Sequence, residues 1–259
     1  MLRTRVIPCL QLINSSLVKT VKFGKHHYIG DPVNTVRIFN ELEVDELCFL
    51  DIRATVENRR PNLEILKQIA DECFMPLSFG GGIQHAEQAA EILAIGFEKV
   101  VINSAAFKKP ELISEIADHS GSQSVVGSID VKKNIWGAYQ VFSHDGTRKE
   151  QHDPIDWAVE LEKRGAGELL ITSMDKDGTW NGYDLDIIRL ISNAVRIPVI
   201  ANGGAGQVEH LRQAVHDAKA SAVALGSMVV YQRKGMGVLV NFPDRHELER
   251  CLNHNAGII

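Results

Sequence analysis

Three residues of this chain stand at positions that could serve a reacting centre: Asp130, Gln11 and Lys19. Asp130 and Gln11 each follow directly on a short apolar run. A carboxyl group there can exchange a proton or simply hydrogen-bond the end of a strand, whereas a glutamine amide cannot exchange a proton at accessible pH. Lys19 lies between predicted elements, where it could reach an anionic substrate or stay solvated. The residues predict an acid or base at Asp130 and a degenerate position at Gln11.

Two glycine-rich turns, each followed by a second polar turn, could bind phosphate. The four turns are Gly80-Gly81-Gly82 with Asn103-Ser104, and Gly203-Gly204 with Gly226-Ser227. Glycines let backbone N–H groups approach phosphate oxygens, and a helix that starts behind them adds a favourable dipole. The alternative is that the glycines are packing turns. Because the arrangement occurs twice, we expect a ligand that carries two phosphates.

Each of four charged residues comes directly before an apolar run, and strand alternation places it on the same side as every second residue of that run. They are Arg5, Glu46, Lys99 and Glu168. In a barrel, they would form a ring of two cations and two anions at one mouth. Such a ring is either a stabilising plug or a gate for a small molecule. Asp51 is out of phase with Glu46, so we expect it to point away from the lumen unless a bulge intervenes.

The apolar patterns that must position these residues alternate between strands and helices. Strand-like runs occupy 6–10, 47–50, 76–79, 100–102, 124–129, 169–172, 198–201 and 222–225. Helical periodicity occupies 32–42, 62–73, 86–93, 111–117, 155–164, 185–194 and 208–218, with N-caps expected at Asp31 and Asp153. Eight strands that alternate with helices predict a closed (β/α)8 TIM barrel of the α/β class, as one domain over residues 1–259.

The two halves of the chain resemble each other at an offset of about 122 residues. The segment 75–83, which contains the first glycine-rich turn, parallels 197–205, and 46–50 parallels 168–172. The pattern predicts a barrel built from two duplicated half-barrels. Two long loops, 12–31 and 132–153, follow the first and fifth strands, and loops of that length are usually functional.

Composition excludes several classes of partner. Of 259 residues, 24% are charged and the formal net charge is −5, without a basic cluster interleaved with aromatics, so nucleic acid is a poor partner. No apolar run approaches the ~20 residues of a spanning helix, which favours a cytoplasmic protein without membrane contact. The four cysteines (Cys9, Cys48, Cys73 and Cys251) are far apart, which favours reduced, buried thiols. No cofactor and no metal are expected.

Several motifs in order resemble one family, the cyclase subunit of imidazole glycerol phosphate synthase, HisF. They are Arg5-Val-Ile-Pro-Cys-Leu, Phe49-Leu-Asp-Ile, Phe79-Gly-Gly-Gly-Ile, Ile102-Asn-Ser-Ala-Ala, Gly121-Ser-Gln, Asp177-Gly-Thr and Gly182-Tyr-Asp-Leu. The resemblance implies a barrel that docks a glutaminase at its amino-terminal face, takes ammonia through the lumen and uses it at the other face. It also implies that the four-charge ring is the ammonia gate. Asp177 and Gly178 join the expected phosphate positions.

The departure from this family is Gln11, where the cyclase carries an aspartate that works with the one at Asp130. Three segments are similar instead to a paralogous branch: 17–23, 131–134 and 238–243. That branch accompanies a glutaminase and a separate ATP-dependent sugar amidotransferase in acetamidino modification of surface-polysaccharide sugars. The first expectation is therefore an ammonia-conducting barrel subunit of a glutamine-dependent complex that amidates such a sugar. The alternatives are an active cyclase in histidine biosynthesis and a non-catalytic activator of a glutaminase.

Overall fold

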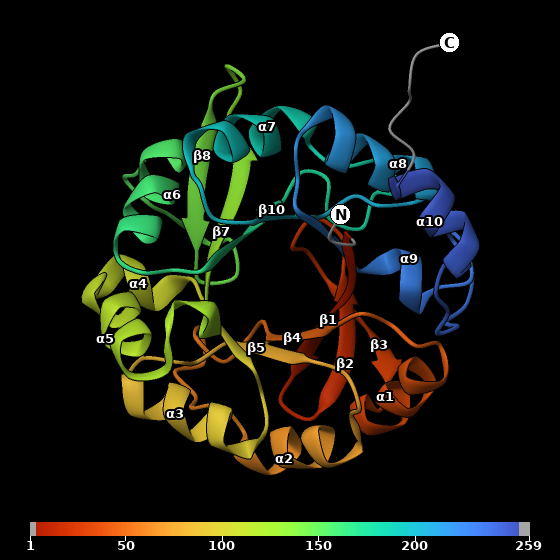
Figure 1. Ribbon diagram of the computed structural model, residues 1–259, viewed down its shortest axis with the longest axis horizontal. Helices are drawn as coiled ribbons and strands as arrows, with labels where there is room; N and C mark the ends of the chain where they lie inside the picture. Colours follow the sequence, from red (N-terminus) through yellow and green to blue (C-terminus); the bar gives the residue numbers. More distant parts are fainter. Residues whose placement is uncertain (1–3, 254–259) are drawn as a thin grey trace.

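Eight parallel strands close into a barrel in the computed structural model, which describes residues 4–253 (Figure 1). Each strand pairs with the next, including β7 with β10, and the last strand, β12, pairs with the first, β1, to close the barrel. The barrel strands are β1 (Arg5–Ile13), β4 (Leu47–Asp51), β5 (Leu77–Gly80), β6 (Lys99–Ile102), β7 (Val125–Lys133), β10 (Glu168–Ser173), β11 (Val199–Asn202) and β12 (Ala222–Leu225). The predicted TIM barrel is confirmed.

Helices surround the strands in a ring (Figure 1). They are α1 (Pro32–Glu41), α2 (Leu63–Glu72), α3 (Ala86–Ile95), α4 (Ser104–Lys108), α5 (Glu111–Ser120), α6 (Pro154–Lys163), α7 (Leu185–Ala194), α8 (Val208–Arg212), α9 (Ser227–Val230) and α10 (Arg245–Asn253), with a 3-10 turn over Ser122–Ser124 and a π turn over Gln213–Asp217. The expected N-caps are present, since Asp31 accepts a hydrogen bond from the Asn34 N–H and Asp153 from the Ile155 N–H. No helix within residues 4–253 has both the length and the hydropathy to cross a membrane.

The two expected long loops are instead antiparallel strands that extend the sheet. After β1 the chain turns back as β2 (Ser16–Thr20) and β3 (His26–Gly30), and after β7 as β8 (Tyr139–Ser143) and β9 (Arg148–Lys149). Both β1 and β7 run nine residues, beyond the barrel rim, so their ends offer backbone groups for pairing. The prediction of irregular loops was wrong, although both segments do lie at the carboxyl ends of the strands.

The same features recur in the same order in both halves. A paired extension follows β1 in the first half and β7 in the second, and the short helices α4 and α9 follow β6 and β12. This order agrees with the duplication read from the sequence. Helix α10 was not predicted from the sequence. It packs against α8 and buries Leu248 and Leu252.

Side-chain alternation divides the core into two layers. One layer lies between strands and helices and includes Leu10, Phe39 and Phe79. The other fills the lumen, and from β1 it receives Ile7 and Cys9, the phase expected from the sequence. All four cysteines are free; Cys9 and Cys48 are buried, while the other two are only half-buried.

Candidate functional site

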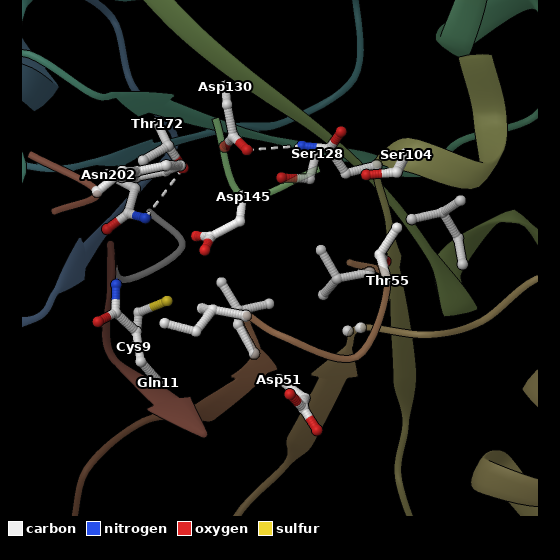
Figure 2. Close-up of a pocket in the computed structure, with 18 of the residues that line it drawn as sticks. Cys9, Gln11, Asp51, Thr55, Ser104, Ser128, Asp130, Asp145, Thr172 and Asn202 are labelled. Atoms are coloured by element: carbon white, nitrogen blue, oxygen red, sulfur yellow. Dashed lines mark hydrogen bonds between the residues drawn. The ribbon is translucent and has the colours of Figure 1, made fainter. Parts of the chain in front are cut away.

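A cavity opens at the carboxyl ends of the barrel strands and encloses about 930 Å³ of empty space, counted out to solvent (Figure 2). Its wall contains many of the predicted site residues: Gln11, Lys19, Gly82, Asn103, Ser104, Asp130, Asp177 and Gly226. They come from both halves of the barrel, so closure of the sheet brings together residues far apart in sequence. We call this space the top cavity.

Asp130 lies on β7 at the wall of the top cavity. Its Oδ2 accepts a hydrogen bond from Asn103 Nδ2 at 2.8 Å. Burial raises the pKa of Asp130 to about 7, and the negative charge of Asp145 adds to the shift, while the hydrogen bonds from Thr172 and Asn103 oppose it. Asn103 Oδ1 is itself buried, and the described part of the chain offers it no hydrogen-bond partner. A carboxyl group that titrates near pH 7 suits general acid–base work.

Lys19 is held in a buried ion pair on β2. Its Nζ lies 2.7 Å from Asp177 Oδ1 and donates to the Thr20 carbonyl oxygen at 2.7 Å, and the residue is only 3% exposed. The alternative of a solvated lysine was therefore wrong. The packing is tight enough that a Cβ on Gly226 would lie 3.0 Å from Lys19 Cε. The pair places a balanced cation and anion in the cavity wall.

Gln11 ties β1 to β2. Its Oε1 accepts hydrogen bonds from the Thr20 backbone N–H at 2.9 Å and from the Thr20 hydroxyl at 3.2 Å. The Thr20 hydroxyl also lies 3.0 Å from Asp177 Oδ2. The amide thus has a structural partner where an aspartate would have placed an ionisable group.

Asp145 is a carboxylate of the top cavity that the sequence analysis missed. It sits in the turn between β8 and β9, and Figure 2 shows its side chain pointing into the cavity. Burial raises its pKa to about 6, against the opposing charge of Arg53, whose guanidinium lies 3.6 Å away. The dipeptide Asp145-Gly146, a turn signal inside a supposed loop, could have indicated a hairpin tip.

Asp51 closes β4 and borders the same cavity, but its carboxylate is engaged elsewhere. It accepts hydrogen bonds from two guanidinium nitrogens of Arg59, at 3.0 and 3.2 Å, and from the backbone N–H groups of Arg53 and Ala54. We assign it to holding the segment between β4 and α2.

The expected phosphate positions fall into two groups. Gly82, Asn103, Ser104, Asp177 and Gly226 line the top cavity, whereas Gly178, Gly203, Gly204 and Ser227 are not among its lining residues. Backbone crowding and a positive φ require glycine at four of them. A Cβ would lie 2.5 Å from the Arg59 carbonyl oxygen at Gly82, 2.8 Å from a backbone carbonyl oxygen at both Gly178 and Gly203, and would overlap the Gly182 carbonyl oxygen at Gly204. The glycines therefore have a packing role, and phosphate binding stays a prediction.

The four charged residues expected at the other mouth form a closed ring of ion pairs at the amino ends of the strands. Arg5 contacts Glu46 at 2.6 Å and Glu168 at 2.7 Å, and Lys99 contacts the same two carboxylates at 3.1 and 3.2 Å. Burial lowers the pKa of Arg5, but the two carboxylates outweigh it and raise that pKa above its ordinary value. We call these four residues the charged ring.

A second, much smaller cavity lies in the lumen beside Glu46 of the charged ring and has a volume of about 10 Å³, about the space of one water molecule. Its lining is almost entirely apolar and includes Ile7, Leu170 and Ile200, together with Glu46 of the ring. Val101 contributes to the walls of both this space and the top cavity. The lumen therefore presents, in order, a charged ring, an apolar chamber and a polar cavity with carboxylates. No group of three or more potential metal ligands occurs in residues 4–253.

Comparison with known proteins places this architecture in a family. The model of the histidine biosynthesis protein family matches residues 5–235. The chain is 49% identical over 249 residues to a candidate imidazole glycerol phosphate synthase subunit, hisF2, of Pseudomonas aeruginosa, covering 96% of this chain and 99% of that protein. It is 44% identical over 250 residues to a candidate HisF subunit of Leptospira borgpetersenii (96% and 98%), and 42% identical over 253 residues to a candidate hisF3 subunit of Vibrio vulnificus (97% and 97%). The chain belongs to the histidine biosynthesis protein family, as a HisF-type imidazole glycerol phosphate synthase subunit homologue.

Proposed function

We propose that this chain is the ammonia-using subunit of a glutamine amidotransferase and that it adds ammonia to a phosphorylated small molecule in the top cavity. One observation carries the proposal: a charged ring, an apolar chamber and a carboxylate-lined cavity follow one another along a single barrel lumen. The family resemblance supplies the partner, a HisH-like glutaminase docked over the charged ring. The site of action is expected in the cytoplasm.

The apolar lining of the lumen is compatible with the passage of neutral ammonia. An apolar chamber strongly disfavours an ion, because burying an unpaired charge is far costlier than burying a small neutral molecule. Neutral ammonia can therefore enter where ammonium cannot. The charged ring would be the gate, since Arg5 and Lys99 bridge both carboxylates and at least one of these contacts must lengthen to open the mouth.

The names of the relatives favour imidazole glycerol phosphate synthase chemistry at the top cavity over the polysaccharide reading that Gln11 suggested. Asp130, with a pKa of about 7, would transfer protons, and Lys19 would hold Asp177 in place beside the reacting groups. The turns at Gly82 and Ser104 would receive a phosphate of the substrate.

A second candidate function is delivery of ammonia to a separate ATP-dependent sugar amidotransferase, for acetamidino modification of a surface-polysaccharide sugar. The engagement of Gln11 with Thr20 favours it, because this side chain holds β2 and cannot exchange a proton. A barrel that only activates its glutaminase would need no cavity behind the charged ring, so the small apolar chamber argues against that third possibility.

The test is ammonium-dependent turnover by the purified chain. Given the ribonucleotide substrate of imidazole glycerol phosphate synthase and an ammonium salt, the chain should form imidazole glycerol phosphate, detected by mass spectrometry. Absence of product above the no-enzyme control would overturn the cyclase function. Transfer of ammonia to a sugar after addition of the ATP-dependent amidotransferase would then establish the second candidate.

A further inference from the structure

Two carboxyl groups from different parts of the fold face the same cavity. Asp130 lies on barrel strand β7 and Asp145 in the turn between β8 and β9, and both line the top cavity (Figure 2). Each is buried enough that its pKa is raised, to about 7 for Asp130 and about 6 for Asp145, and the charge of Asp145 is one cause of the shift at Asp130. The charge of Asp145 therefore acts on Asp130 at the wall of the same cavity.

The turn that carries Asp145 is built to hold it there. The His144 backbone N–H donates to Ser104 Oγ at 3.0 Å, which fixes the turn to the start of α4. Thr147 closes the turn by donating its backbone N–H and its hydroxyl to the His144 carbonyl oxygen. His144 and Asp145 both have left-handed backbone conformations, with φ of 52° and 58°. Such φ values are uncommon outside glycine, but His and Asp adopt them more readily than most residues. The position of the carboxyl group is thus set by the fold of the turn.

The other charged groups around Asp145 leave it available. Arg53, from the segment after β4, is its ion-pair partner among the described residues, at 3.6 Å, and His26 on β3 contributes a favourable charge. Asp51 is occupied by Arg59, and Lys19 with Asp177. Of the carboxyl groups within residues 4–253 that line the cavity beside Asp130, Asp145 is therefore the one with the longest ion-pair contact.

We propose that Asp145 is the second proton-transfer group of the top cavity and works with Asp130 in the place of the acid that Gln11 cannot supply. This inference rests on the proposed acid–base chemistry of the cavity. With a pKa of about 7 for Asp130 and about 6 for Asp145, Asp130 retains its proton more readily near neutral pH, while Asp145 is mostly ionised. One member accepts a proton from the attacking nitrogen or the substrate carbon, and the other donates its proton to the leaving atom. The pair then returns to its starting protonation state by exchange with solvent.

The experiment compares Asp145→Asn with the wild-type chain in steady-state assays that use ammonium salt and the ribonucleotide substrate of imidazole glycerol phosphate synthase. Asparagine tolerates the left-handed backbone as well as aspartate does, so the turn should keep its shape. We expect kcat to fall about 100-fold or more with KM within about threefold of wild type. Asp145→Glu, which restores a carboxyl group, should recover part of kcat, and Asp118→Asn on the exposed face of α5 is the matched control with no expected effect.

A second readout does not depend on turnover. Carbon-13 NMR titration of aspartate-labelled protein, with Asp130 assigned from the Asp130→Asn variant, should show its pKa lowered by roughly half a unit or more in Asp145→Asn, because a neighbouring negative charge is removed. An unchanged Asp130 pKa overturns the pair, and so does a kcat of Asp145→Asn within about threefold of wild type. A wild-type chain that shows no turnover overturns the cyclase function instead, and the titration then decides the pair by itself.

Discussion

Replacing Lys99 by Met separates the two possible roles of the charged ring. Lys99 contacts Glu46 at 3.1 Å and Glu168 at 3.2 Å, and its side chain is 14% exposed. The substitution removes one of two cations, but Arg5 stays bound to both carboxylates at 2.6 and 2.7 Å. The free energy of unfolding should therefore fall by about 1–3 kcal/mol, between the value for an exposed pair and that for a fully buried one.

The assay measures coupling in the complex of the chain with its glutaminase. The ratio of aminated product to glutamine hydrolysed should fall, because an open ring lets ammonia escape or water enter, while turnover with added ammonium salt should persist. Lys109→Met is the matched control, since it removes an exposed ion pair with Glu115 and should change neither the ratio nor, by more than about 1 kcal/mol, the stability. A Lys99→Met complex that stays fully coupled would refute the gate and leave the ring as a stabilising plug.

Three further substitutions follow from the top cavity. Asp130→Asn should stabilise the chain at high pH: the folded pKa of about 7 lies above the unfolded value near 4, so the stability of the wild type falls as pH rises between them. The difference in free energy of unfolding between Asp130→Asn and the wild type, measured in urea, should shift in favour of the variant by about 2–3 kcal/mol between pH 5 and pH 8. A difference that does not change with pH would show that Asp130 is not buried as described. Lys19→Met should cost about 3–5 kcal/mol of unfolding free energy because it leaves Asp177 buried without its cation, and a loss below about 1 kcal/mol would mean that the pair is solvated. Gln11→Asp should raise ammonium-dependent cyclase turnover about tenfold or more, and unchanged turnover would indicate that this position is no longer part of the acid–base machinery.

The sequence predicted those features that depend on local periodicity. Alternation along β1 placed Arg5, Ile7 and Cys9 on one side, and Ile7 and Cys9 do lie in the lumen. The same alternation brought the residues of the charged ring into one phase, and the structure joins them by ion pairs. Aspartate followed by proline marked the starts of α1 and α6. Each of these features is determined by residues a few positions apart, or by closure of a barrel whose strand count could be read directly.

Features that depend on one segment folding back against another part of the chain could not be predicted from local periodicity. Burial of Lys19 results from the pairing of β2 with β1 and from contact with Asp177, 158 residues further along the chain. Asp145 reaches the cavity only because β8 pairs with β7 and the turn anchors on Ser104. Helix α10 follows a stretch without strong periodicity, and its two buried leucines are recognisable only once α8 is in place. In each case the deciding partner is distant in sequence.

The most direct test is the origin of the nitrogen that reaches the product. The complex of the chain with its glutaminase is supplied with glutamine labelled with nitrogen-15 at the side-chain amide, the ribonucleotide substrate, and an excess of unlabelled ammonium salt at a concentration that alone supports slow but measurable turnover. If ammonia travels through the lumen from the charged ring to the top cavity, the product should carry nitrogen-15 almost completely. A product whose label matches the diluted ammonia of the bulk solution would contradict passage through the barrel.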